Sequence, residues 1–239
     1  MSYIRYKNKN LFVESVSVRR LTSKFNTPFY LYSEGGIIEN YKSFSNNFKK
    51  SKPLICFSVK ANSNIQILKV LKKMGSGADV VSGGELLKAI KSGIKPNKIV
   101  FSGVGKTEDE IKLAIKKNIL LINVESENEA ILINKIASNL RKKIAIGIRL
   151  NPDINDPTHK KISTGKAEDK FGLSKTNLIS FCLNIKKLKN LKLNAISVHI
   201  GSQILSENTF KKTLKVLEEI IEKTKIYFKY VDLGGGFGI

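Results

Sequence analysis

A lysine, a histidine and a run of three glycines are the residues whose types and positions in this sequence suggest chemistry. Lys60 ends the hydrophobic run LICFSVK at residues 54–60. A lysine that closes a buried strand has its charged form disfavoured by desolvation, which makes the amine available for Schiff-base formation. The alternative is a lysine whose ammonium reaches solvent at the rim, and position alone favours neither interpretation.

The three glycines and the histidine close two later hydrophobic runs. Gly234, Gly235 and Gly236 end YVDLGGG, where successive glycines let the backbone approach a ligand and offer several N–H groups to a phosphate. A flexible turn is the other interpretation of such a run. His199 lies in VHIGSQI and could stack on a flat ring or donate a hydrogen bond, or it could be satisfied within the core. The glycine and serine beside it suit close approach to a phosphate.

Short β-branched runs alternate with amphipathic stretches along the chain. The predicted strands are residues 54–60, 78–82, 98–103, 120–125, 143–151, 195–201 and 230–236, and the predicted helices are 64–74, 84–91, 107–118, 126–139, 174–187 and 207–225. This spacing predicts parallel strands joined by crossover helices. Seven such strands favour a (β/α)8 TIM-type barrel over a doubly wound sheet, because no dinucleotide fingerprint opens the first unit. The run TPFYLY and a helix near residues 36–50 would lead into the barrel.

The two faces of each predicted strand differ in character. Side chains alternate along a strand, and in residues 143–151 isoleucines and a leucine oppose Ala145, Gly147 and Arg149. We expect the bulky register to pack under the helices and the other to face the barrel axis. The strands would then aim polar groups at the C-terminal mouth, where barrels keep their chemistry: Lys60, Asn123, Arg149, His199 and Asp232. Polar groups buried together are costly unless a ligand or a network satisfies them.

Two further segments contain candidate site residues. Asp79 and Glu85 flank a glycine-bearing turn in ADVVSGGEL, and either could face the site, although Glu85 could equally support the first turn of the next helix. Residues 149–173 form a long polar connection that contains His159. Such a connection is typical of a lid or a binding loop, and a disordered insertion is the alternative.

Composition limits the other classes of function. The formal net charge is +22, which first indicates a nucleic-acid partner, but the lysines are spread along the chain without clustering or interleaved aromatics. We therefore expect a solvated surface and no nucleic acid. No apolar run reaches the roughly 18 residues that a membrane span needs, and no secretory signal is visible. Cys56 and Cys182 lack metal-ligand or disulfide spacing, so we expect packing residues, no metal and a reducing cytoplasm.

In combination, these segments resemble the barrel-type, pyridoxal-phosphate-dependent amino acid decarboxylases of the alanine-racemase-like fold. FSVKANSN is similar to the segment with the family's Schiff-base lysine, and GSGADVVSGGEL to its second-strand signature. RLNP, followed by THKKISTG and KFG, resembles the fifth strand and lid. VHIGSQI resembles the sixth strand, and VDLGGGFGI the phosphate-binding glycines. The resemblance covers about residues 28–239, with all five motifs in order.

The resemblance implies pyridoxal 5'-phosphate as the cofactor and Lys60 as the Schiff-base residue. It implies that His199 packs on the cofactor ring, and Lys60 and His199 are the expected catalytic residues. The other residues that it places at the cofactor are Asp79, Arg149, Ser202, Gly234, Gly235 and Gly236, and it makes Glu85 a site-lining group.

The resemblance also implies a carboxy-lyase that works as a homodimer on an amino acid. The glutamine of HIGSQ and the STG…KFG loop favour diaminopimelate as the substrate, with lysine and carbon dioxide as products, as in the last step of lysine biosynthesis. Another basic-amino-acid decarboxylase of the ornithine or arginine type remains an alternative. A non-catalytic pyridoxal-phosphate-binding barrel is a second one, although it would complete its eighth strand.

One departure from the family pattern concerns the end of the sequence. The eighth strand with its EPGR-like motif does not appear, nor does the C-terminal β-domain with its catalytic cysteine and tyrosine. We therefore expect a fragment in which residues 1–25 are a strand-rich extension of the missing β-domain and residues 26–239 are the truncated barrel. Open sheet edges lead us to expect that this fragment is unstable and inactive alone.

Overall fold

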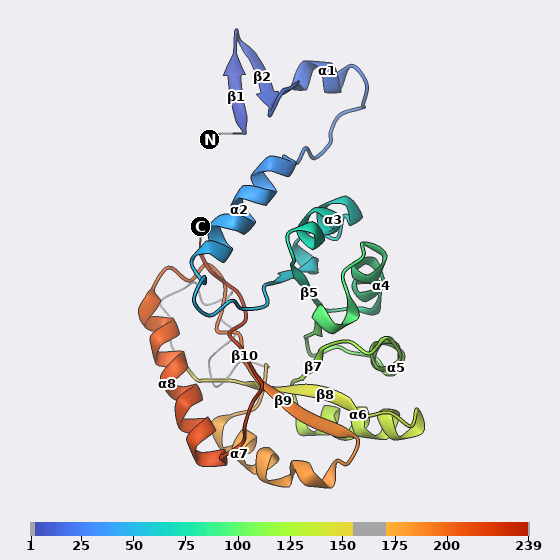
Figure 1. The fold of residues 1–239 in the computed structure, drawn as a ribbon, viewed down its shortest axis with the longest axis vertical. Helices are drawn as coiled ribbons and strands as arrows, with labels where there is room; N and C mark the ends of the chain where they lie inside the picture. The colour runs from blue at the N-terminus through green and yellow to red at the C-terminus, as the bar shows by residue number, and fades with distance from the viewer. Residues whose placement is uncertain (1–2, 155–170, 239) are drawn as a thin grey trace.

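The computed structural model describes residues 3–154 and 171–238. Seven parallel strands form one sheet in the order β10-β9-β8-β7-β6-β5-β4, so each strand lies beside the next one in the sequence. They are β4 (Cys56–Ser58), β5 (Gly77–Val80), β6 (Ile99–Phe101), β7 (Leu121–Val124), β8 (Ile144–Leu150), β9 (Leu191–Val198) and β10 (Tyr230–Asp232). This order, with helices on the outer side, is that of an incomplete (β/α) barrel, and the predicted fold class is confirmed (Figure 1).

Five successive helices of the barrel, α3 to α7, start at a polar side chain that caps their first turn. The helices of the barrel are α2 (Glu34–Asn46), α3 (Ile65–Lys73), α4 (Gly83–Lys91), α5 (Glu108–Lys117), α6 (Glu127–Asn139), α7 (Lys175–Asn184) and α8 (Glu207–Thr224). Side chains of Asn64, Ser82, Thr107, Ser126 and Ser174 accept hydrogen bonds from the first turns of α3 to α7. These caps satisfy backbone N–H groups that have no partner within the helix, so each helix begins where its strand–helix turn ends.

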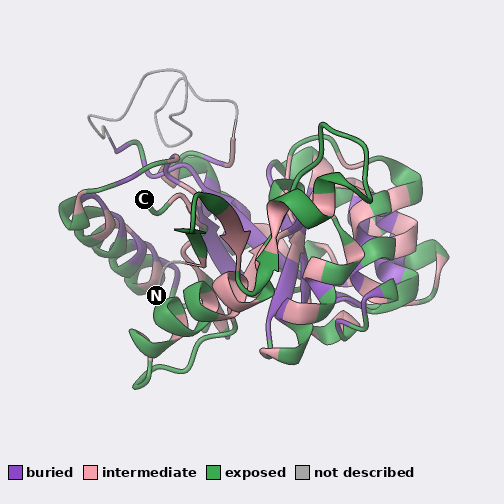
Figure 2. Cartoon of the chain, turned by 90° about the horizontal axis from the view of Figure 1, so that it is seen from above, coloured by how far each residue is buried: buried purple, intermediate pink, exposed green. Residues whose placement is uncertain are grey.

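The core lies between the sheet and the helices, as the alternation of side chains predicts. Ile146 and Ile148 of β8, with Ile196 and Val198 of β9, belong to the large outer cluster and are at most 2% exposed. Figure 2 shows these buried strands beside helices whose outer faces are exposed. The opposite register forms a smaller inner cluster of Val100, Leu121 and Ala195, against which Cys56, Ala145 and Tyr230 pack. Val231 is an exception, at 47% exposure, because it lies on the edge strand β10.

The N-terminal segment forms its own small sheet. Its elements are β1 (Ile4–Lys7), β2 (Asn10–Val13), β3 (Val16–Ser17) and α1 (Val18–Thr22). They stand at the far end of α2 from the parallel sheet (Figure 1), and the described residues among them are exposed or only partly buried. The strand content agrees with the prediction, whereas the assignment of residues 1–25 to another domain stays a prediction. The run TPFYLY is not a strand, since residues 28–32 are exposed coil.

None of the helices in the described ranges is long and apolar enough to cross a membrane.

Candidate functional site

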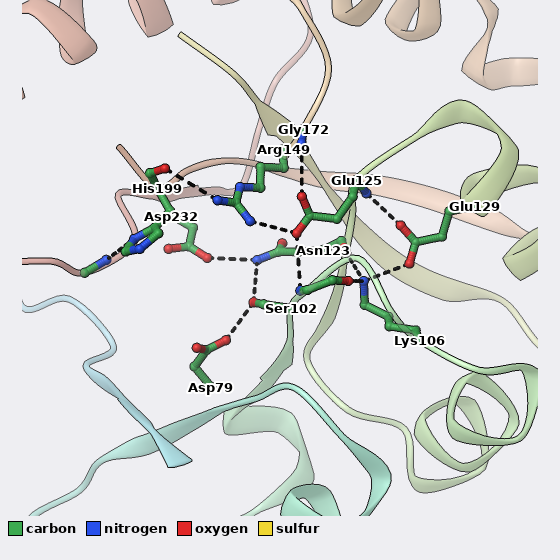
Figure 3. Close-up of polar contacts among 12 residues, drawn as sticks. Asp79, Ser102, Lys106, Asn123, Glu125, Glu129, Arg149, Gly172, His199 and Asp232 are labelled. Carbon is green, nitrogen blue, oxygen red and sulfur yellow. Dashed lines mark hydrogen bonds and ion pairs between the residues drawn. The ribbon is translucent and has the colours of Figure 1, made fainter. Parts of the chain in front are cut away.

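Polar side chains that lie on or directly after the strands meet inside the curled sheet and form a lower layer of the site, and Figure 3 shows Asp79, Ser102, Asn123 and Asp232 of this layer. Ser102 Oγ donates to Asp79 Oδ1 at 2.6 Å, and Ser58 Oγ donates to Asp79 Oδ2 at 3.1 Å. Asn123 Nδ2 donates to Ser102 Oγ at 3.3 Å and to Asp232 Oδ2 at 3.0 Å. The predicted inward register of β7 and β10 is therefore confirmed, and one hydrogen-bonded chain connects the two carboxylates.

This lower layer has polar capacity that the described residues leave unused. Asn123 Oδ1 and Ser197 Oγ are buried without a hydrogen-bond partner in the described part of the chain. Gly147 faces the amide of Asn123 so closely that a Cβ atom there would collide with Asn123 Oδ1. Native proteins rarely leave buried polar atoms unpaired, so the layer is suited to receive a further polar group.

The pKa of Asp79 is shifted by its burial and by the charges of its neighbours Asp232 and Lys60. Burial is the main cause that raises the pKa of Asp79 above its ordinary value, and the negative charge of Asp232 acts in the same direction. The hydroxyls of Ser102 and Ser58 and the charge of Lys60 oppose this rise. Asp79 lies in this lower layer and is more easily protonated than an exposed carboxyl group, whereas its role at a cofactor stays a prediction.

A second group of charged residues follows the rim at the C-terminal ends of the strands. Arg149 Nη1 donates to Glu125 Oε1 at 2.8 Å, with side-chain exposures of 10% for the arginine and 4% for the glutamate. Arg149 Nη2 donates to the carbonyl oxygen of His199 at 3.4 Å, and the Phe171 ring centre lies 4.7 Å from the guanidinium. Arg149 therefore connects β8 to the end of β9, as the prediction of a mouth-facing arginine requires.

Lys106 and Glu129 extend this rim toward β6. Lys106 Nζ donates to Glu129 Oε1 at 2.8 Å and to the carbonyl oxygens of Gly103 and Asn123 at 2.6 and 2.7 Å. Its side chain is 1% exposed. The sequence analysis missed Lys106 because it lies in the loop after β6, where no periodicity marks it. It also missed Glu125, although Glu125 shares the inward register of Asn123.

His199 lies against the glycine turn that follows β10. The backbone N–H of Gly235 donates to His199 Nδ1 at 3.2 Å, so Nδ1 carries no proton. Burial lowers the pKa of His199 to about 4, and the positive charges of Arg149 and Lys60 act in the same direction. The imidazole is consequently neutral at neutral pH and available as an uncharged, flat surface.

The glycine turn has the geometry of a backbone cradle. Gly234 and Gly236 have φ angles of +69° and +85°, a region that residues with a side chain rarely adopt. A Cβ atom at Gly236 would collide with the carbonyl oxygen of Gly201, whereas a Cβ atom at Gly235 would meet nothing within 4 Å. Open space therefore lies beside the middle glycine.

The predicted phosphate contact Ser202 lies beside this cradle. The backbone of Ile204 donates to the carbonyl oxygen of Gly236 at 2.8 Å, which aligns residues 201–204 with residues 236–238. A Cβ atom at Gly236 would be 3.4 Å from the Cα atom of Ser202. The structure thus brings together the serine and the glycines that the sequence singled out.

The prediction that Lys60 lies in a water-poor lumen is wrong for the described structure. The first strand ends at Ser58, and Val59–Ala61 form a short 3-10 turn, in which Lys60 is exposed. The physical reason is the position of β4 at the edge of the sheet, where no described strand covers its outer side. The ammonium nevertheless acts on the site, since its charge contributes to the pKa values of Asp79 and His199.

Two other candidates have structural roles. Glu85 Oε2 accepts from the backbone N–H of Val81 at 2.9 Å, which agrees with the alternative that it supports the first turn of its helix. Burial raises the pKa of the Cys56 thiol to about 12, and Cys56 packs against the inner cluster. His159 and most of the expected lid lie outside the described residues, which resume at Phe171.

Comparison with known proteins identifies what this arrangement is similar to. The profile of the family described as "Pyridoxal-dependent decarboxylase, pyridoxal binding domain" matches residues 34–239. The diaminopimelate decarboxylase of Aquifex aeolicus is 42% identical over 99% of the chain. The diaminopimelate decarboxylase of Helicobacter pylori is 44% identical over 92% of the chain. The chain spans 57% and 55% of the lengths of these two relatives.

Solved structures of diaminopimelate decarboxylases have the same fold as this chain. The H. pylori diaminopimelate decarboxylase complexed with L-lysine superposes with a TM-score of 0.87 at 42% identity, over 93% of this chain and 57% of that one. A diaminopimelate decarboxylase from M. jannaschii superposes with a TM-score of 0.91 at 36% identity, over 99% of this chain and 57% of that one.

Proposed function

This chain belongs to the pyridoxal-dependent decarboxylase family, and from that premise we propose that it is the cofactor-binding part of an enzyme that converts diaminopimelate to lysine and carbon dioxide. The observation that carries the proposal is the contact between His199 Nδ1 and the Gly235 N–H, which joins a flat neutral ring to a backbone cradle. The names of the relatives support the substrate. Related structures from H. pylori and M. jannaschii hold L-lysine, the product expected from diaminopimelate.

The residues of the site fit pyridoxal phosphate. Open space beside Gly235 and the positive φ angles of Gly234 and Gly236 suit a phosphate bound by backbone N–H groups. Ser202, which adjoins Gly236, supplies a hydroxyl to the same place. The unpaired Asn123 Oδ1 and Ser197 Oγ offer partners for the polar edge of a bound ring.

In this proposal Lys60 would hold the cofactor covalently through its side-chain amine. Its exposure keeps the amine accessible, so the role of Lys60 rests on the FSVKANSN motif and on its proximity to Asp79 and His199 rather than on desolvation. Asp79, whose pKa is raised mainly by burial, can accept a proton near that amine. His199, which is uncharged at neutral pH, would hold the flat ring of the cofactor, and Arg149 would line the site beside it.

The chemistry of decarboxylation comes from the cofactor, whose ring accepts the electron pair that remains when the carboxylate leaves as carbon dioxide. The chain itself would bind and orient the ring, through His199, the glycine turn and the unpaired polar atoms of the lower layer. A proton must then replace the carboxylate on the substrate carbon. We propose a homodimer for the whole protein and, because Cys56 and Cys182 are free thiols, the cytoplasm as its location.

The test compares two lysines in the whole protein that carries this chain. Lys60→Ala should abolish both the absorbance of the lysine-bound cofactor and the release of carbon dioxide from diaminopimelate. Lys69→Ala, which alters an exposed lysine on α3, should leave both intact. Release from ornithine or arginine but not from diaminopimelate would favour the other basic-amino-acid decarboxylases. Cofactor absorbance without release from any of these amino acids would favour a binding protein.

A further inference from the structure

We propose that Glu125 is a positioning residue of this site, which holds the Arg149 guanidinium in the one orientation that lets it line the cofactor. The inference rests on the proposed function, because the cofactor gives Arg149 its role. It extends that function by assigning a task to a buried carboxylate at the end of β7. Glu125 acts through Arg149: within the described residues its carboxylate accepts from Arg149 and from the backbone of Gly103 and Gly172.

Glu125 uses both of its oxygen atoms on three separate parts of the rim (Figure 3). Oε1 accepts from Arg149 Nη1 at 2.8 Å and from the Gly103 N–H at 3.2 Å. Oε2 accepts from the Gly172 N–H at 3.1 Å. With a side-chain exposure of 4%, this carboxylate is almost out of contact with water, so its three donors fix its orientation.

Arg149 depends on that carboxylate for its charge balance. Among the residues that the structure describes, Glu125 is the one carboxylate that forms an ion pair with Arg149. The other contacts of the guanidinium are the carbonyl oxygen of His199 at 3.4 Å and the ring of Phe171 at 4.7 Å, and both are neutral. A buried guanidinium without its counter-charge is strongly disfavoured, so Arg149 would turn toward solvent if Glu125 were neutralised.

The orientation of Glu125 is itself fixed before any ligand binds. Its backbone N–H donates to Glu129 Oε2 at 2.7 Å, and Glu129 Oε1 accepts from Lys106 at 2.8 Å. Lys106 also binds the carbonyl oxygens on either side, those of Gly103 and Asn123. The loops after β6 and β7 therefore form a rigid support for Arg149, as the outer partners of a preorganised site do.

The first test needs no cofactor. An arginine-specific dicarbonyl reagent should modify Arg149, which is 8% exposed as a whole residue, much more slowly than Arg141, which is exposed on the surface. In Glu125→Gln the rate at Arg149, read by peptide mass, should rise toward that of Arg141. The matched control is Glu110→Gln, since Glu110 also accepts backbone N–H groups, from Gly83 and Thr107, but does not contact Arg149. It should leave the rate at Arg149 unchanged.

The second test is a double-mutant cycle on the affinity for pyridoxal phosphate. Glu125→Gln should weaken binding roughly tenfold, a loss typical of removing an outer positioning partner. In an Arg149→Met background the same change should weaken binding by less than about twofold, because its target is gone. A merely structural role for Glu125 would give equal losses in both backgrounds.

The outcomes separate the inference from the function on which it rests. Equal losses in the cycle, or an unchanged rate of Arg149 modification in Glu125→Gln, overturn the positioning role even if the wild type binds the cofactor through Lys60. Failure of the wild type to bind pyridoxal phosphate overturns the proposed function and the cofactor-related purpose of Glu125. The modification rate still decides whether Glu125 holds Arg149.

Discussion

Replacing Lys106 with methionine is expected to destabilise the protein by about 3–5 kcal/mol, the cost of breaking a buried ion pair from one side. The substitution keeps most of the length of the side chain but removes an ammonium group that is 1% exposed. Glu129 loses its partner at 2.8 Å, and two carbonyl oxygens lose a donor. The lower end of the range, about 3 kcal/mol, is favoured because the Glu129 side chain keeps 13% exposure, so water still reaches its carboxylate.

The assay is chemical denaturation of the whole protein, with Lys112→Met as the matched control. Lys112 is 43% exposed and pairs with Asp109 at 3.1 Å on the outer face of α5, so its loss should cost less than about 1 kcal/mol. Adding Glu129→Gln to Lys106→Met should recover part of the lost stability, because a neutral amide needs no counter-charge. If Lys106→Met costs no more than Lys112→Met at neutral pH, the reasoning about the rim is refuted.

Three further predictions concern the glycine turn, the histidine and the thiols. Gly236→Ala should destabilise the protein by at least about 1 kcal/mol, because Gly236 has a φ of +85°. Gly235→Ala should leave thermal stability intact but weaken the binding of pyridoxal phosphate, because its methyl group would fill the open space. Equal stabilities of the two variants would contradict this prediction. Burial lowers the pKa of His199 to about 4, so the folded state resists protonation of this histidine. The stability that the neutral histidine contributes should therefore be full above about pH 6.5 and lost as the pH falls toward 4. The stability of His199→Gln, measured by denaturation across this range, should lack this pH-dependent loss. Burial raises the pKa values of Cys56 and Cys182 to about 12 and 11. Both thiols should therefore react with an alkylating reagent only after unfolding, as read by peptide mass. Rapid labelling of the native protein would show that the two thiols are not packed as described.

The order of strands and helices could be predicted because its signals are local. The expected helix at residues 107–118 is found as α5, Glu108–Lys117, with Thr107 as its N-cap and Asn118 in the left-handed conformation at its end. Strand alternation likewise predicted which side chains of β8 and β9 face the helices. These features depend on hydrogen bonds and contacts within one strand–helix unit, which the sequence of that unit already contains.

The exposure of Lys60 could not be predicted, because it depends on what covers the edge of β4. The sequence marks the lysine at the end of an apolar run, but the chain leaves the strand at Ser58 and turns before reaching it. The charged residues of the rim could be predicted only in part, because some of them reach the site from loops rather than from strands. Glu125 has the same parity as Asn123 and could have been found, whereas Lys106 reaches the site from a loop, through contacts that only the folded chain creates.

The most direct test of the account is to identify which lysine holds the cofactor. The whole protein, saturated with pyridoxal phosphate, is treated with borohydride to make the lysine–cofactor bond permanent, and its peptides are then mapped by mass. One modified residue, Lys60, is expected, and no modification is expected when Gly236 is replaced by alanine. Stoichiometric modification of a different lysine, or none in the wild type, would show that Lys60 does not hold the cofactor.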